Sequence, residues 1–154
     1  MRVEYINPFL EAANSILTEV LQSPVKRGEI NLKSTATPVL GVAAFVGLAG
    51  DVEGRVLFDM SRITALKIAS TMNAENMIRI DDMVKSTINE LANMIVGSAV
   101  TRLQENGFNF DLTPPAIIVG DNMEITNQRM EALVVPMVTP QGVVEINVAV
   151  RERI

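Results

Sequence analysis

A long helix is predicted around the stretch Ser86-Thr-Ile-Asn-Glu90-Leu-Ala-Asn93-Met-Ile-Val-Gly97-Ser-Ala99. At about 100° per residue, one side of this helix carries an apolar stripe formed by Val84, Ile88, Leu91, Ile95 and Ala99. The opposite side carries Ser86, Glu90, Asn93, Gly97, Thr101 and Gln104. The pattern therefore predicts a helix with one buried face and one polar face.

The polar face has an unusual composition. Exposed helix faces usually carry Lys, Arg and Glu, whereas this one has a single carboxylate, two amides and small residues. A glycine costs a helix about 1 kcal/mol relative to alanine, so Gly97, one turn after Asn93, indicates that space is needed there. An ordinary solvated helix face is one interpretation. The glycine favours the other, a surface that a second protein approaches closely.

The bulk composition is that of one domain spanning residues 1–154, with 48% hydrophobic residues and a mean hydropathy of +0.27. Such a content indicates either a large core or an apolar face covered by a partner. The net charge of −5 argues against nucleic acid or an anionic membrane as partner. We expect a cytoplasmic protein, because no apolar run approaches the roughly 18 residues of a membrane span and the N-terminus lacks a signal peptide's apolar region.

Two residue types are absent from the sequence, cysteine and histidine. Without cysteine there is no thiol nucleophile and no zinc or iron–sulfur site built on thiolates, and without histidine the commonest general base and metal ligand are missing. Phosphate-binding and nucleophile-elbow motifs are also absent. Any enzymatic chemistry must therefore rely on positioning, or on a partner that supplies the reactive groups, and we expect neither a metal site nor a cofactor of the chain's own.

Local signals predict the other elements. A helix is expected over residues 7–21, with Asn7 as N-cap and Pro8 at its first position, and another over residues 61–72, capped by Ser61. The long helix is expected to open at Asp81-Asp82, run to Gln104 and end at Asn106-Gly107. Strands are predicted over residues 25–34, 39–48, 52–60, 108–112, 116–119, 132–138 and 143–151, with a hairpin turn at 49–51, a polar loop at 120–127 and a tight turn at 139–142.

The order of elements has a rough internal symmetry. Glu11 and Asn14 in the first helix repeat the spacing of Glu90 and Asn93, which indicates an ancestral duplication. The first copy differs in one respect, since Thr18 stands where Gly97 would be. A bulkier residue there would hold a partner further away, so we interpret Glu11 and Asn14 as remnants. The sequence leaves open whether they form a second active site.

The pattern S-x-x-x-E-x-x-N, followed by Met-Ile-x-Gly-x-Ala, resembles the signature of the CheC/CheX/FliY family of chemotaxis phosphatases. The opening Ile-Asn-Pro-Phe and the single-site pattern look most like its CheX branch, and the resemblance covers nearly the whole chain. The family signature extends to a downstream proline. Either Pro114 or Pro115 fills that place here, and the sequence does not say which.

The resemblance implies hydrolysis of the aspartyl-phosphate on a CheY-type response regulator. Glu90 would pair with the regulator's active-site lysine, and Asn93 would orient a water for attack on phosphorus. Ser86 and Gly97 would contact the partner, and Mg²⁺ would belong to the partner's phosphorylation site. This mechanism suits a chain without histidine or cysteine, because phosphoryl transfer is catalysed mostly by positioning and electrostatics.

The predicted fold class is α+β, a mostly antiparallel sheet with two long helices side by side on one face and pseudo-symmetric halves. A homodimer is also expected, with the final strand, residues 143–150, as a sheet edge open to pairing. Two alternatives to a phosphatase stay open. One is a non-catalytic regulator-binding or flagellar-switch adaptor, which would not need both Glu90 and Asn93; the other is a structural homodimer that packs its polar helix face on itself.

Overall fold

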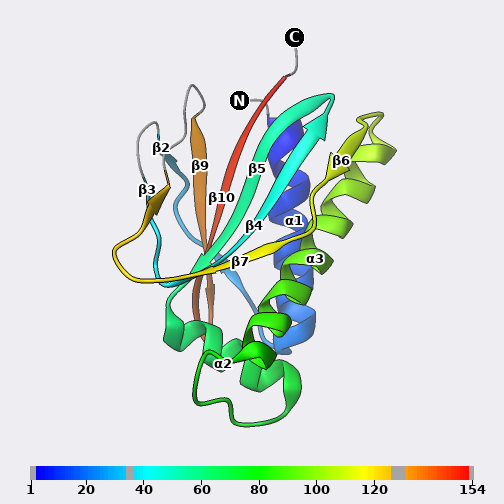
Figure 1. The fold of residues 1–154 in the computed structure, drawn as a ribbon. Helices are drawn as coiled ribbons and strands as arrows, with labels where there is room; N and C mark the ends of the chain where they lie inside the picture. The colour runs from blue at the N-terminus through cyan, green and yellow to red at the C-terminus, as the bar shows by residue number, and fades with distance from the viewer. Residues whose placement is uncertain (1–2, 34–36, 126–130, 153–154) are drawn as a thin grey trace.

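The computed structural model describes residues 3–33, 37–125 and 131–152 of the chain. Within these ranges, three helices pack against one face of an eight-stranded antiparallel sheet (Figure 1). No helix in them is long and apolar enough to cross a membrane. The predicted α+β class is confirmed.

The helices are α1 (Val3–Leu21), α2 (Arg62–Asn73) and α3 (Asp82–Glu105). Figure 1 shows α1 and α3 side by side along the sheet, as predicted, while α2 lies across one end of the molecule. Ser61 caps α2, its Oγ accepting a hydrogen bond from the Thr64 N–H at 3.1 Å. Asp81 caps α3 in the same way through the Val84 N–H at 3.0 Å. The predicted Ser61 cap is confirmed, and so is the predicted opening of the long helix at Asp81-Asp82.

The main sheet has the strand order β1-β9-β10-β5-β4-β6. In addition, β2 pairs with β9, as β1 does, and β7 pairs with β4, as β6 does. The bounds are β1 Lys26–Arg27, β2 Asn31–Lys33, β4 Val42–Gly50, β5 Val52–Met60, β6 Phe110–Leu112, β7 Ala116–Val119, β9 Ala132–Thr139 and β10 Gly142–Glu152. A separate two-stranded ribbon pairs β3 (Thr37–Pro38) with β8 (Glu124–Ile125).

The two halves of the chain repeat one arrangement around the central β5–β10 pairing. Each half begins with a long helix and contains a hairpin, β4–β5 in the first and β9–β10 in the second. The short strands that follow each helix cross to the other half, so β1 and β2 pair with β9 while β6 and β7 pair with β4. The ribbon strands β3 and β8 pair with each other. The pseudo-symmetric halves predicted from the sequence are therefore present, and α2 has no counterpart among the described residues of the second half.

The start of the first helix was predicted wrongly. α1 begins at Val3, so Asn7 is not its N-cap and Pro8 lies inside it. Tyr5 and Ile6 are buried, and the Tyr5 ring packs edge-on against Phe108 with 5.1 Å between the ring centroids. This burial stabilises an extra helical turn before the proline, although Pro8 has no N–H to donate within the helix.

The last strand was also placed wrongly, since β10 is not a sheet edge. It pairs with β9 on one side and with β5 on the other, so it lies in the middle of the sheet. Its loosely alternating sequence could not reveal this, because β5, its second partner, is far away in the chain. The described edges are the short strands β1 and β2 on one side and β6 and β7 on the other.

Several smaller boundaries differ, among them the start of β6, which is Phe110 rather than residue 108. The strand predicted over residues 25–34 is split into β1 and β2, and its last residue, Ser34, lies outside the described residues. β4 begins at Val42 rather than at residue 39. The loop predicted over residues 120–127 contains the short strand β8, and residues 126–127 lie outside the described part of the chain. The turns at residues 49–51 and 139–142 join β4 to β5 and β9 to β10 as expected.

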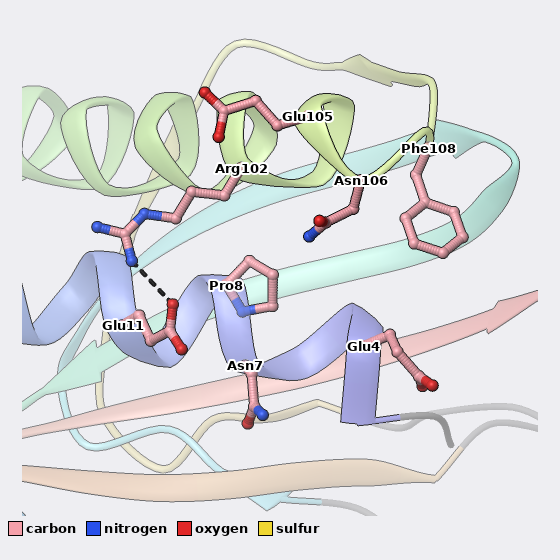
Figure 2. Close-up of a pocket in the computed structure, with 8 residues that line it drawn as sticks. All are labelled: Glu4, Asn7, Pro8, Glu11, Arg102, Glu105, Asn106 and Phe108. Atoms are coloured by element: carbon pink, nitrogen blue, oxygen red, sulfur yellow. Dashed lines mark hydrogen bonds and ion pairs between the residues drawn. The ribbon is translucent and has the colours of Figure 1, made fainter.

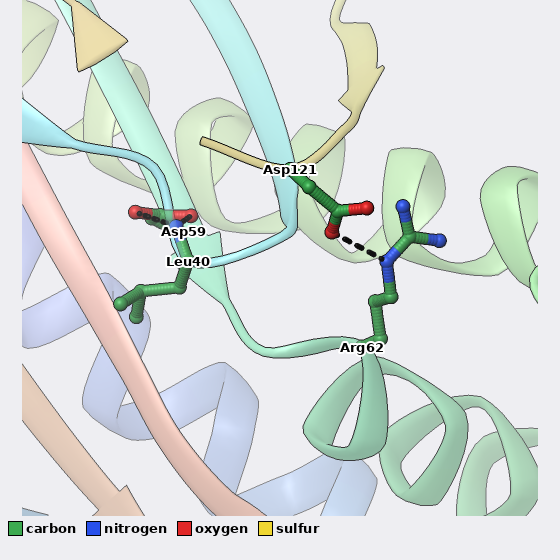
Figure 3. Close-up of polar contacts among 4 residues, drawn as sticks. All are labelled: Leu40, Asp59, Arg62 and Asp121. Carbon is green, nitrogen blue, oxygen red and sulfur yellow. Dashed lines mark hydrogen bonds and ion pairs between the residues drawn. The ribbon is translucent and has the colours of Figure 1, made fainter. Parts of the chain in front are cut away.

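The core lies between the helices and one face of the sheet, and a smaller cluster lies on the other face. There, Val39, Ala43 and Leu57 are buried beneath the β3–β8 ribbon. Asp59 is also buried on this face, and both its carboxylate oxygens lie 3.0 Å from the backbone nitrogen of Leu40 (Figure 3). Arg62 and Asp121 form an exposed ion pair of 3.5 Å nearby. The Asp59 contact attaches the segment before β4 to the sheet, and the ion pair joins the start of α2 to the loop after β7.

Candidate active site

The exposed face of α3 carries all four residues singled out in the sequence. Ser86, Glu90, Asn93 and Gly97 are exposed, whereas the predicted stripe on the opposite side is buried. This arrangement follows from the helical period and from the packing of α3 against α1 and the sheet. The sequence therefore placed these side chains correctly on one surface.

Gly97 is open to solvent in the direction of its missing side chain. A Cβ built at this position would meet no atom within 4 Å, apart from the helix itself. A close contact between helices would be a structural reason for a glycine at this position. Within the described chain, Gly97 makes no such contact. Its carbonyl accepts a hydrogen bond from Thr101 Oγ1 at 3.0 Å.

Beside Asn93 lies an open hollow of about 430 Å³ between α3 and the β6–β7 connection, which we call the α3–β6 hollow. It is lined by Val46, Asn89, Asn93, Val96, Leu112, Thr113, Pro114 and Pro115. Both prolines line it, so the geometry gives each of them a place beside Asn93. Sequence reasoning missed Asn89 and Thr113 as site residues. The position of Asn89 next to Glu90 was a signal that could have pointed to it.

The rim of this hollow is a bulge in the sheet. β6 and β7 both pair with β4, but three residues, 113–115, stand opposite only Val46 and Gly47. Two hydrogen bonds attach the rim to β4, from the Thr113 N–H to the Gly47 carbonyl at 3.0 Å and from the Gly47 N–H to Thr113 Oγ1 at 2.7 Å. A Cβ at Gly47 would lie 3.0 Å from the Thr113 methyl group, so the glycine allows this close approach.

The corresponding residues of the first helix are engaged within the chain. Glu11 Oε2 accepts a hydrogen bond from Arg102 Nη1 of α3 at 3.0 Å, and Figure 2 shows the two side chains directed at each other. Asn14 Oδ1 accepts a hydrogen bond from the Thr18 hydroxyl at 3.4 Å. By contrast, the described residues provide no hydrogen-bond or ion-pair partner for the side chains of Glu90 and Asn93.

A larger hollow of about 720 Å³ lies where α1 meets the end of α3. It is lined by Glu4, Asn7, Pro8, Glu11, Arg102, Glu105, Asn106 and Phe108 (Figure 2). Its lining contains three carboxylates and one guanidinium, of which only Glu11 is directed at Arg102, and it lies at the C-terminal, negative end of the α3 dipole. This environment disfavours an incoming phosphoryl group. The structure therefore supports the interpretation of Glu11 and Asn14 as remnants.

The exposed face of α3 offers an amide and a carboxylate one turn apart, without a thiol or a histidine. An amide has donors and an acceptor and can orient a water molecule without taking up a proton. A carboxylate without an internal partner can bind a cation of another protein. In the part of the chain that the structure describes, no three carboxylates are grouped so that they could hold a metal ion.

Comparison with known proteins agrees with this picture. Over 126 residues, which is 81% of each chain, this chain is 27% identical to a CheY-P phosphatase CheX from Thermotoga maritima. A CheX from Borrelia burgdorferi, solved in a complex with CheY, BeF₃ and Mg²⁺, is 45% identical with a TM-score of 0.84, covering 98% of this chain and 100% of that one. A CheC-like superfamily protein from Shewanella sp. PV-4 is 27% identical with a TM-score of 0.89, covering 98% and 99%.

The family model for the chemotaxis phosphatase CheX matches residues 42–138, a range that contains α3, the α3–β6 hollow and both strands of the β4–β5 hairpin. This match spans well over half of the chain, and the chain belongs to the CheX family of chemotaxis phosphatases.

Proposed function

We propose that this protein dephosphorylates a CheY-type response regulator in the cytoplasm and so ends a chemotactic signal. The observation that carries the proposal is the exposed α3 face, on which Glu90 and Asn93 have no partner in the described chain and Gly97 leaves space for another protein. The similarity to a CheX named as a CheY-P phosphatase, and to a CheX solved with CheY, supports the same substrate.

In the proposed reaction, Asn93 enters the regulator's phosphorylation site and orients a water molecule in line with the bond to be broken. The water oxygen attacks phosphorus, the bond to the aspartyl oxygen breaks, and the regulator regains a carboxylate while the water's proton leaves with the phosphate. Glu90 forms an ion pair with the regulator's lysine. Mg²⁺ is expected in the regulator's site, as in the Borrelia complex, and this chain is expected to contribute no cofactor. Catalysis of this type rests on positioning and charge.

Ser86 and Gly97 extend the docking surface on either side of the two functional side chains. Both are small and exposed, so the regulator's backbone can come close to α3. The whole chain, residues 1–154, would act as one domain. Association into a homodimer remains a prediction, and because β10 is enclosed, one of the described edge strands β1, β2, β6 and β7 would have to provide any strand edge for it. The oligomeric state in solution tests this.

The adaptor alternative predicts binding without catalysis. Asn93→Ala separates the two functions, because an exposed amide contributes little to stability whereas an unaligned water costs orders of magnitude in rate. We expect the variant to fold, to retain most of its affinity for the regulator, and to lose its acceleration of phosphate release. The measurement is release of radiolabelled phosphate from the regulator.

The parent protein and the regulator alone are the controls for this measurement. A parent protein that binds the phosphorylated regulator without accelerating release would support the adaptor. An Asn93→Ala variant with the parent's rate would contradict the assigned role of the amide.

A further inference from the structure

A second amide lies next to Asn93 in the α3–β6 hollow. Asn89 is half-buried and stands four residues earlier on α3, about 6 Å along the helix axis. The described residues offer no hydrogen-bond partner to either side chain. Because Asn89 is only half-buried, water can bind its amide in the free protein, and a polar group of a partner can replace that water.

The first half of the chain provides an internal comparison. When the two E-x-x-N motifs are aligned, Leu10 occupies the position of Asn89, and its side chain is only 1% exposed. A leucine packs well at this position of the fold, and leaving an amide there has no evident benefit for stability. The two halves therefore differ at Asn89 and at Gly97, and both differences open the α3 face to a partner.

The hollow is also formed in advance of any binding. Its rim is attached to β4 by the two hydrogen bonds between Thr113 and Gly47, and two consecutive prolines restrict the backbone of residues 114–115. Val46, Val96 and Leu112 give it an apolar floor, and Leu112 is 39% exposed. A preformed recess with apolar walls and a few polar groups is typical of a binding site.

We propose that the α3–β6 hollow receives a main-chain segment of the phosphorylated response regulator from beside its phosphorylation site, and that Asn89 is a docking residue for it. The inference rests on the proposed function. Any regulator whose phosphoryl group reaches Asn93 must place atoms over the hollow, because Asn93 itself lines it. The Asn89 amide donates to a peptide carbonyl and accepts from a peptide N–H, while an apolar side chain of the segment packs on Val96 and Leu112.

Steady-state kinetics of Asn89→Ala test the assignment. We expect KM for the phosphorylated regulator to rise about tenfold, the usual size for a lost amide pair, while kcat changes less than about twofold. The Kd for regulator loaded with BeF₃ and Mg²⁺ should rise by the same factor. Asn93→Ala should show the opposite pattern, with kcat lost and Kd nearly retained.

Two further variants make the experiment specific. Asn89→Leu introduces the residue of the first helix and should lose affinity as Asn89→Ala does; parental affinity in it would show that packing suffices and overturn the role of the amide. Gln104→Ala removes an exposed amide from the same helix, about 16 Å from Asn93 along the axis, and should change neither KM nor Kd. An equal change in Gln104→Ala would overturn the specific role of Asn89.

Failure of the proposed function and failure of the docking role of Asn89 give different experimental results. Absence of any accelerated phosphate release by the parent protein contradicts the proposed function. Accelerated release by the parent, with KM unchanged in Asn89→Ala, overturns the docking role of Asn89 and leaves the function intact. Circular dichroism verifies that both Asn89 variants fold.

Discussion

Single residues on α3 determine what can approach this protein. Glu90 and Asn93 offer a charge and an amide, Asn89 offers a second amide, and Gly97 leaves an open space one turn away. The two asparagines and the glycine depart from what an exposed helix face selected for stability alone would carry. The departures are concentrated on one face within three turns, which is where a partner would have to bind.

Substitution of Gly97 by a residue with a side chain should preserve or raise the stability of the protein, whereas a large side chain at this position should lower its phosphatase activity. Gly97→Ala removes a helix-weakening residue at an exposed position with free space around it, and should raise the free energy of unfolding by up to about 1 kcal/mol. Gly97→Leu should fold equally well but block the regulator's approach to Asn93 and lower the phosphatase rate. Urea unfolding and phosphate release measure the two effects. A Gly97→Leu variant with the parent's kinetics would show that the regulator does not pass over this position.

At the scale of elements, α1 and α3 carry the same motif in different surroundings. α3 presents its copy beside the β6–β7 bulge, with both prolines at the rim. α1 has its glutamate tied to Arg102 and its asparagine to Thr18. The same spacing of residues therefore gives a candidate active site in one half and an internal contact in the other.

The double variant Glu11→Ala/Asn14→Ala should keep the parent's phosphatase rate within about twofold. Its cost in stability should be small, because the Glu11–Arg102 pair is partly exposed and such pairs contribute about 0–1 kcal/mol. Phosphate release and urea unfolding provide the measurements, with Glu90→Ala/Asn93→Ala as the matched control. Loss of about half of the rate in the α1 variant would mean that the first helix forms a second active site.

At the scale of the whole molecule, the sheet separates two environments. One face holds the main core under the helices, and the other buries charged and polar side chains, among them Asp59 and Asn147. Asn147 accepts a hydrogen bond from Arg55 at 2.9 Å. Burial raises the pKa of Asp59 to about 6; the Leu40 and Met60 N–H groups oppose this shift, and the negative charge of Glu145 adds to it.

The raised pKa of Asp59 predicts a loss of stability as the pH rises. An unfolded aspartate titrates near 3.9, so between about pH 4 and 6 the folded state binds more protons, and the free energy of unfolding falls across that window by up to about 3 kcal/mol. Asp59→Asn keeps an acceptor for the Leu40 N–H without the charge. It should remove this part of the pH dependence and be at least as stable as the parent at pH 7.

Urea unfolding of both proteins at pH 4.5 and pH 7 checks this prediction. Asp59→Ala serves as the contrast, because it also removes the acceptor and should be less stable than Asp59→Asn at either pH. Equal pH dependence in the parent and in Asp59→Asn would contradict the assignment.

The sequence by itself determined the elements that depend on local patterns. The apolar stripe of α3, its start at Asp81-Asp82, the two hairpins and the exposure of Glu90, Asn93 and Gly97 all follow from periodicity and turn chemistry within a few residues. Its largest local error was the start of α1, where the burial of Tyr5 and Ile6 outweighed the usual position of a proline.

Only the tertiary structure decided what depends on residues far apart in the chain. The central place of β10 comes from its pairing with β5, and the engagement of Glu11 comes from Arg102 on another helix. The α3–β6 hollow exists because the bulge at residues 113–115 is fixed to Gly47 and so lies beside Asn89 and Asn93. These contacts join segments whose local sequences carry no signal for each other, since strand partners are selected by the packing of the whole molecule.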